Sequence, residues 1–322
     1  MFTCSVCQSH KQPVLFKVKE MYYGTFEEFT YSRCDDCYVL NLVDIPVDLG
    51  KYYPSNYHCH FVSKAENNGF KNKLFSKRSQ AVLTNNKFSL GFLINLVKPY
   101  QSKFKVFSTA GLTVDSRILD IGCGAGDFLI ELRNAGFKNL TGVDPFLPEE
   151  LQKYYADEIR FIRSDLFQVN EVFDFIVLNH AFEHMPDHIQ VLEKIKDLLS
   201  SNGKICIRVP VTEGLAWEKY RENWYQLDAP RHLTIHSLKS MDLLLKRAGL
   251  RLDHVVFDSE PTQFTRSEIY SKRISSVDFL NKYKGDLNQF FSTEQIREFS
   301  KLTQIANDNQ KGDQAAFFIS RA

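Results

Sequence analysis

The chain has 322 residues, 43% hydrophobic and 25% charged, which excludes a disordered, collagen-like or coiled-coil protein and suits about two globular domains. Forty Lys and Arg against 39 Asp and Glu leave a formal charge of +1, so the overall charge does not point to nucleic acid. The N-terminus has no signal-peptide core, and the longest apolar run, Leu90–Val97, is shorter than the about 20 residues of a membrane span. We therefore expect a cytoplasmic protein without a membrane span.

Residues 1–50 are distinguished by paired cysteines. Four of the seven cysteines lie here, in two Cys-x-x-Cys pairs separated by 26 residues. In a cytosolic chain such pairs indicate a metal site before they indicate disulfides. Four thiolates complete a tetrahedral zinc site with no open position, so this zinc would be structural; unligated thiols or a redox pair are the alternative. We predict a zinc-ribbon leader with β runs near 14–18 and 22–31, and the zinc ligands Cys4, Cys7, Cys34 and Cys37.

Residues 51–115 form the second region, which we interpret as a helical connector. Between positions 64 and 105 the chain has nine Lys and Arg residues against one acid, Glu66. A run of like charge usually marks a solvated helix face, although a basic stretch beside a zinc ribbon also suits a contact with nucleic acid. Over residues 64–78 the connector lacks the interleaved aromatic side chains that favour the second interpretation, apart from Phe70 and Phe75, which can anchor an amphipathic helix.

Residues 116–322 alternate apolar strands with amphipathic helices, which is typical of a doubly wound α/β sheet. Ser201, Asn202 and Gly203 are expected to stop a helix and begin a strand. Two segments, 211–236 and 259–313, interrupt the alternation as insertions. The predicted strands are 117–121, 140–143, 160–163, 173–178, 204–209, 252–257 and 314–320, and the predicted helices end near 135, 156, 199 and 248.

A glycine-rich turn follows the first of these strands. Gly122, Gly124 and Gly126 allow a tight turn and a close approach of a ligand at the start of a helix. A dinucleotide-binding turn would need glycine at the position of Asp127, and Asp120 adds a second carboxylate. A cationic ligand suits this turn better than a polyphosphate. S-adenosylmethionine fits, because it carries an ammonium and a sulfonium group and no phosphate.

Two further acids end the next strands. Asp144 can hold ribose hydroxyls, and Asp165 can accept a hydrogen bond from an adenine amino group. The alternative is that each of them serves only as a helix cap, which is a common role of an aspartate at a strand end.

These segments resemble the class I S-adenosylmethionine-dependent methyltransferases. Residues 118–126 resemble their first motif, 142–145 their second, 163–166 their adenine contact, and 173–180 and 198–210 their fourth and fifth strands. The resemblance implies a seven-stranded sheet whose terminal strand is antiparallel and inserted near the edge. With the turn it gives the cofactor-binding candidates Asp120, Gly122, Cys123, Gly124, Gly126, Asp144, Pro145, Asp165, Leu166 and Asn179.

The chain also resembles bacterial methyltransferases of cell-surface carbohydrate clusters. The resemblance lies in 31–57 and in later segments at 225–233, 263–270 and 307–318, and it is weakest in the connector. It implies methyl transfer to a small polar acceptor, with a sugar hydroxyl expected. The insertion at 211–236 supplies Trp217 and Trp224, which suit a sugar ring or, equally, pack a lid against the helices.

Methyl transfer to a hydroxyl needs a base, and histidine is suited to that role near neutral pH. The candidates are His184, His232 and His180. Ubiquinone-pathway O-methyltransferases resemble 179–186 but have an acid, used for a divalent metal, where this chain has His180. Imidazole is a poor ligand for magnesium, so we do not expect that metal. The alternative is that Glu183 and His184 only hold the loop by hydrogen bonds and take no part in catalysis.

Two alternatives remain open at this stage. One is an RNA methyltransferase, against which the absence of Pro-Pro or Pro-Cys after the fourth strand counts. The other is a cofactor-binding scaffold without catalysis. The sequence does not indicate the oligomeric state.

Overall fold

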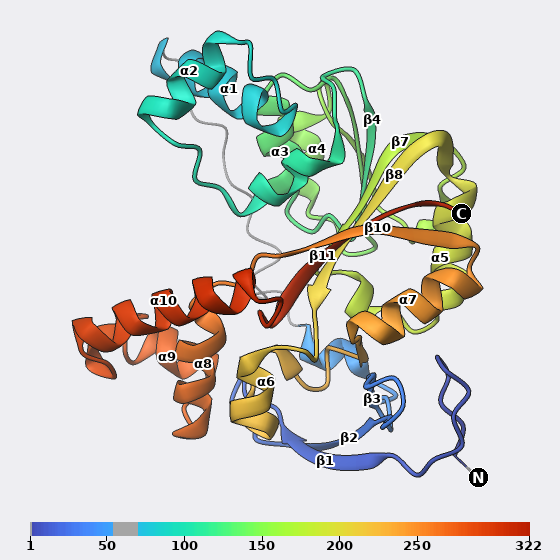
Figure 1. Ribbon diagram of the computed structural model, residues 1–322, viewed down its shortest axis with the longest axis vertical. Coiled ribbons are helices and arrows are strands. Elements are labelled where there is room, and N and C mark those ends of the chain that lie inside the picture. Colours follow the sequence, from blue (N-terminus) through green and yellow to red (C-terminus); the bar gives the residue numbers. More distant parts are fainter. Residues whose placement is uncertain (1, 54–69) are drawn as a thin grey trace.

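The computed structural model describes residues 2–53 and 70–322, and part of the predicted connector, including Cys59, lies outside the described residues. A seven-stranded mixed sheet forms the centre of the molecule, in the order β10-β11-β8-β7-β4-β5-β6 (Figure 1). The last strand, β11, is antiparallel to both of its neighbours, which confirms the predicted sheet. Its strands are β4 (Arg117–Ile121), β5 (Asn139–Val143), β6 (Arg160–Ile162), β7 (Phe173–Asn179), β8 (Leu199–Pro210), β10 (Leu250–Phe257) and β11 (Gln314–Arg321).

Helices cover both faces of this sheet because its central strands are apolar on both sides. Alternate side chains of β4 enter different cores, with Ile118 on one face and Leu119 on the other. The core around Leu119 contains α5 (His188–Asp197) and α7 (Leu238–Arg247). The core around Ile118 contains α3 (Asp127–Asn134), α4 (Glu149–Tyr155), η3 (Lys103–Ala110) and the end of α1 (Phe70–Leu83).

The prediction that residues 201–203 end a helix and begin a strand is wrong in its detail. Helix α5 already ends at Asp197, and β8 begins at Leu199. The register between β7 and β8 moves from Phe173↔Leu199 to Phe175↔Lys204, so the intervening residues form a bulge inside the strand. The glycine therefore marks an irregularity of β8 instead of its start.

A second sheet has the order β1-β2-β3-β9. Three strands come from the leader, and the fourth comes from the insertion after β8, with Leu40 opposite Ile235. The run predicted at 22–31 becomes a strand only at Glu28, because the buried Glu20 carboxylate accepts the backbone N–H groups of residues 22–25 and folds them into a turn. The strands are β1 (Val14–Lys19), β2 (Glu28–Arg33), β3 (Leu40–Leu42) and β9 (Thr234–Ile235).

The remaining elements lie around these two sheets. Helix α2 (Leu90–Val97) packs on α1, far from the leader sheet (Figure 1). No helix within 2–53 and 70–322 has the length and apolar character needed to cross a bilayer. The insertions contribute α6 (Leu215–Tyr220), α8 (Thr262–Ser271), α9 (Ser276–Asn281) and α10 (Thr293–Asp308), and the short helices are η1 (Leu49–Tyr52), η4 (Leu166–Gln168), η5 (Phe182–His184), η6 (Arg221–Asn223), η7 (Tyr225–Leu227) and η8 (Leu287–Gln289).

Candidate active site

The candidate site lies at the carboxyl ends of the parallel strands β6, β5, β4, β7 and β8. Because these strands run in one direction, the loops that follow them meet at one edge of the sheet. Asp120 of β4 is opposite Gly142 of β5, so the glycine turn after β4 lies beside Asp144. Strand β7 adjoins β4 on the other side and brings Asn179 and His180 to the same edge.

The backbone conformation of the turn requires glycine. Gly122 and Gly124 have φ angles of 71° and 51°, which L side chains adopt with strain. A Cβ atom on Gly122 would also lie 2.5 Å from the Cβ of Ala181, so this position requires glycine.

Hydrogen bonds within the protein occupy four N–H groups of this turn. Gly122 and Cys123 donate to the carbonyl of Val143 at 2.8 and 3.3 Å, and Gly126 donates to that of Cys123 at 2.8 Å. Gly124 donates to Asp144 Oδ2 at 3.0 Å. A phosphate-binding turn would direct such groups at its ligand. The turn therefore suits a ligand that approaches closely without a phosphate.

Two carboxylates give this turn its charge. Asp144 is half-buried, and its Oδ1 accepts the N–H of Phe146 at 2.7 Å. Each carboxylate oxygen can accept a second hydrogen bond, so Asp144 can hold the turn and also bind a hydroxyl. Burial, and then the charge of Asp144, raise the pKa of Asp120 well above its ordinary value. A bound cation would offset both effects, which matches the predicted cationic cofactor.

The other cofactor candidates differ in how they are placed. Asp165 accepts the N–H of Phe167 at 2.8 Å and caps η4, which is the alternative that the sequence left open. Leu166 and Cys123 are buried, whereas Pro145 is exposed. The Oδ1 atom of Asn179 accepts a hydrogen bond from Arg208 at 3.0 Å.

The three candidate histidines gather around Glu183, a buried residue of η5. His180 Nδ1 lies 3.2 Å from Glu183 Oε1, and His232 Nε2 lies 3.9 Å from the same atom. The rings of His184 and His232 meet edge to face, with centroids 4.7 Å apart. The Oε2 atom of Glu183 has no partner among the described residues.

Hydrogen bonds fix where the ring protons of these histidines lie. His184 Nδ1 lies 2.9 Å from the carbonyl of Arg231, and His232 Nδ1 lies 2.6 Å from that of Gln226. A carbonyl only accepts, so both Nδ1 atoms carry the proton and both Nε2 atoms keep a lone pair. In contrast, Arg208 donates to His180 Nε2 at 3.0 Å, which turns the His180 N–H toward Glu183.

The charges of this cluster are suited to proton transfer. Burial alone would raise the pKa of Glu183, but the hydrogen bond from His180 and the neighbouring histidines lower it to about 2. Burial lowers the pKa of His232 to about 4. Near neutral pH, Glu183 is therefore ionised and His232 is an uncharged base.

The same cluster has the donor set of a metal site. Glu183, His184 and His232 each offer one ligand atom, and these atoms lie within 4.8 Å of one another. Imidazole and carboxylate together are typical ligands of transition metals.

The insertion at 211–236 does not present its tryptophans to a ligand. Trp217 and Trp224 are 3% and 1% exposed. Trp217 packs on Phe16 of β1, and Trp224 Nε1 donates to Asp313 Oδ2 at 2.9 Å. Stacking of a sugar on these rings is thus ruled out in this conformation, and the second interpretation, a lid packed by its aromatics, describes them better. The core in which both rings lie, however, also contains side chains of the leader.

Two side chains at the site were not predicted. Arg208 is buried and holds Asn179 and His180 in place. A lone arginine in the apolar strand 205–209 is the signal that could have identified it. Tyr53, whose hydroxyl lies 3.0 Å from His184 Nδ1, stands in the connector and gives no comparable signal.

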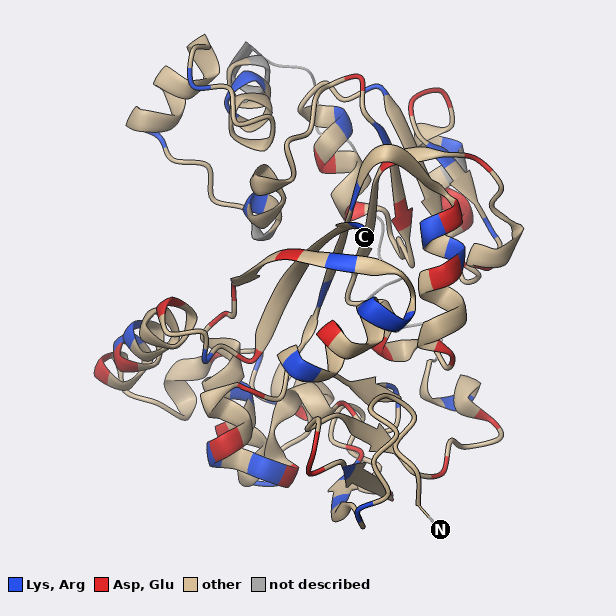
Figure 2. Cartoon of the chain, turned by 45° about the vertical axis from the view of Figure 1, so that its right-hand side comes forward, with Lys and Arg blue, Asp and Glu red and all other residues tan. Residues whose placement is uncertain are grey.

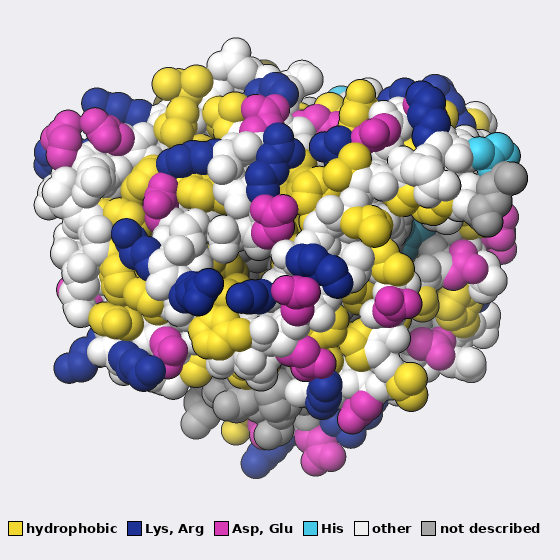
Figure 3. Space-filling model, turned by 90° about the horizontal axis from the view of Figure 1, so that it is seen from below, with side chains coloured by type: hydrophobic (Ala, Val, Ile, Leu, Met, Phe, Trp, Pro, Cys, Tyr) yellow, Lys and Arg dark blue, Asp and Glu magenta, His cyan; other side chains and the backbone are white. Residues whose placement is uncertain are grey.

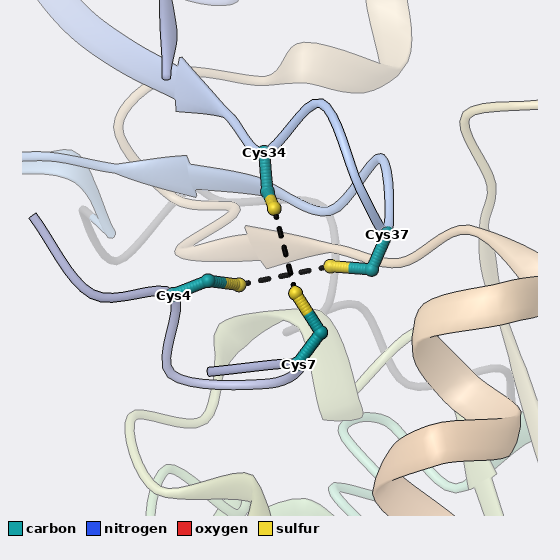
Figure 4. Close-up of side chains that lie close together, drawn as sticks. All are labelled: Cys4, Cys7, Cys34 and Cys37. Carbon is teal, nitrogen blue, oxygen red and sulfur yellow. Dashed lines mark hydrogen bonds between the residues drawn. The ribbon is translucent and has the colours of Figure 1, made fainter. Parts of the chain in front are cut away.

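The four leader cysteines form a separate cluster. Their side chains point toward a common centre between the first loop and the β2–β3 turn (Figure 4). Cys4 Sγ lies 3.6 Å from Cys37 Sγ, and Cys7 Sγ lies 3.6 Å from Cys34 Sγ. Tetrahedral zinc with bonds of about 2.3 Å needs sulfur atoms about 3.8 Å apart, so this cluster fits the ion.

Comparisons with known proteins agree with this arrangement. Residues 93–255 match the model of a family described as a methyltransferase domain. A tRNA U34 carboxymethyltransferase of Pseudomonas paraeruginosa is 28% identical over 151 residues, covering 41% of this chain and 44% of that protein. A trans-aconitate 2-methyltransferase of Enterobacter sp. is 32% identical over 100 residues, covering 30% and 39%. The chain thus spans less than half the length of these relatives.

Among solved structures, a SAM-dependent methyltransferase from Archaeoglobus fulgidus is 20% identical. The alignment covers 72% of this chain and 99% of that chain, with a TM-score of 0.44.

Proposed function

Because the family model covers half of its length, the chain belongs to the methyltransferase-domain family, and we propose that it transfers a methyl group from S-adenosylmethionine to a hydroxyl of a small polar acceptor. The cofactor supplies an electrophilic methyl group on a sulfonium. The glycine turn, Asp120 and Asp144 would hold it, since the turn allows close backbone approach and a bound cation would favour the ionised form of the buried Asp120.

The observation that carries this proposal is the cluster around Glu183. The Nε2 lone pair of His184 or His232 would take the hydroxyl proton, and the ionised Glu183 would stabilise the imidazolium that results. We favour His184, because it is half-buried whereas His232 is 5% exposed. His180 would act through Glu183.

We propose a sugar hydroxyl as the acceptor, on the resemblance to the carbohydrate-cluster enzymes. Because the two tryptophans are buried, recognition of the sugar would depend on polar side chains near η5. The test is incubation with S-adenosylmethionine and nucleotide sugars, small carboxylic acids or bulk RNA, with mass spectrometry of the products. Methyl transfer to RNA alone would replace the proposal by the RNA alternative, and transfer to none of these acceptors would favour a scaffold.

Cofactor binding can be tested at Asp144. Asp144→Ala is expected to weaken S-adenosylmethionine binding by about 1–3 kcal/mol in calorimetry, because buried ribose hydroxyls lose a charged acceptor. Asp144→Asn keeps an acceptor for the N–H of Gly124 and separates loss of charge from collapse of the turn. Asp242→Ala, which removes a half-buried aspartate paired with Lys246 on α7, is the matched control. Wild-type affinity in both Asp144 variants would remove this residue from the site.

We also propose that the leader cysteines bind one structural zinc ion per chain. Elemental analysis of protein purified without chelator is expected to give one equivalent. Cys34→Ser is expected to lower the zinc content and loosen the leader, because the ion supplies order that the three short leader strands lack. Cys59→Ser removes a cysteine outside the two pairs and should keep the metal. Zinc-free wild-type protein that is fully folded would contradict this assignment.

A further inference from the structure

Helix α2 presents an apolar face to solvent. Leu90, Leu93, Leu96 and Val97 are 55–89% exposed, and Phe88, just before the helix, is completely exposed. Their spacing of three, three and one residues places the helical members on one side. We call these five residues the α2 apolar face. Exposed apolar patches of this kind usually mark an interaction site.

The orientation of this face is fixed by the opposite side of the helix. Gly91 is buried against α1, where a Cβ atom would lie 1.9 Å from the carbonyl oxygen of Lys77. Arg78 of α1 donates to the carbonyl of Lys98 at 3.3 Å, just after the helix. Because α2 is held from behind, its apolar residues point outward together.

The segment of the chain that contains this face has charges of one sign. From residue 67 to residue 114 the chain has eight Lys and Arg residues and no acid. Lys87 and Lys98 stand at the two ends of α2, and Lys77 and Lys105 are also exposed. Helices α1 and α2 show blue and no red segments in Figure 2. In contrast, the face on the far side of the molecule mixes blue and magenta side chains throughout (Figure 3).

We propose that the α2 apolar face docks on an anionic lipid surface. Aliphatic side chains would enter the boundary between headgroups and acyl chains, and the flanking lysines would meet the lipid phosphates. A second copy of this chain is disfavoured, because it would bring a second set of the exposed cations Lys77, Lys87, Lys98 and Lys105 against the first. RNA is disfavoured as well, since leucine and valine do not stack on bases and Phe88 is the one aromatic residue of the face.

The test is flotation of the full chain with lipid vesicles. Vesicles of phosphatidylcholine with about one third phosphatidylglycerol are expected to bind the protein, and binding should weaken as sodium chloride is raised. Leu93→Ser/Leu96→Ser should lower the partition coefficient about tenfold or more. Lys87→Gln and Lys98→Gln should each lower it about fivefold.

Matched controls distinguish binding through this face from nonspecific binding to vesicles. Leu280→Ser/Ile305→Ser replaces two residues of similar exposure, 50% and 54%, on α9 and α10. Lys17→Gln/Lys282→Gln removes two exposed lysines elsewhere. Both controls should bind vesicles like the wild type, and unchanged melting temperature and cofactor affinity show that each variant is folded.

Three outcomes would overturn the proposal. The first is equal binding to vesicles with and without the anionic lipid, or to none. The second is a dimer in sedimentation that the serine pair dissociates. The third is RNA binding that is lost in the lysine variants while vesicle binding is absent. Because vesicle binding needs no methyl acceptor, its failure leaves the proposed function unaffected.

Discussion

Replacing His184 by glutamine is expected to lower the rate of methyl transfer by about 10²–10⁴-fold. Glutamine keeps a hydrogen-bonding group beside Tyr53 and the carbonyl of Arg231 but cannot take up the acceptor's proton. Affinity for S-adenosylmethionine should be unchanged, since the glycine turn is untouched. Single-turnover rates on the true acceptor and calorimetry with the cofactor measure the two quantities separately.

The other histidines complete this experiment. His232→Gln and His180→Gln are made in parallel, because both rings lie near Glu183. His254→Gln, at an exposed position on β10, is the control. If all three cluster variants turn over at close to the wild-type rate, the histidine base is wrong, and positioning alone or another residue such as Tyr225 must account for catalysis.

Replacing Arg231 by methionine is expected to destabilise the leader and the insertion by about 3–5 kcal/mol. The Arg231 side chain is fully buried and donates to Glu20 at 3.0 Å and to Asp228 at 2.7 Å. Burial would raise the pKa of Asp228, but the charge of Arg231 outweighs it and lowers that pKa to about 2. Without the arginine, Asp228 would lose both of its hydrogen bonds from that side chain, and the charge of Glu20 would keep only the donors of its own turn. Urea unfolding followed by tryptophan fluorescence reports this region, because both tryptophans share its core.

Two further variants serve as controls for Arg231→Met. One breaks an exposed ion pair, and the other also neutralises a carboxylate that Arg231 contacts. Arg160→Met breaks an ion pair with Glu171 in which both side chains are more than half exposed, and it should cost about 0–1 kcal/mol. Arg231→Met/Asp228→Asn should recover part of the lost stability, because it also removes the charge that Arg231 balances. A cost for Arg231→Met as small as that for Arg160→Met would show that the buried triad is not needed for the fold.

The central sheet could be predicted because its strands are local signals. Each is a short apolar run, and the first is followed by glycines whose positive φ angles no other residue adopts easily. The histidine cluster was predicted in part, since 179–186 is one continuous segment. Its relation to Glu183 was not, because the tautomers depend on carbonyls of Arg231 and Gln226 and on Arg208, which are distant in sequence.

The leader sheet was predicted less well. Its fourth strand, β9, has two residues, too few for any pattern, and pairs with β3 from the other end of the chain. The buried tryptophans mislead for the same reason. Phe16, the partner of Trp217, belongs to a strand about 200 positions away, so sequence alone cannot distinguish a packed ring from one that binds a ligand.

The pairing of β3 with β9 has a consequence for biosynthesis. Leu40 leaves the ribosome long before Ile235, and at about 5–20 residues per second the interval is about 10–40 seconds. During that time the nascent leader has neither its outer strand nor the aromatic residues of the insertion that cover it. Its apolar side chains would then be exposed to chaperones, and early capture of a metal ion would add order to the pairing of its own three strands.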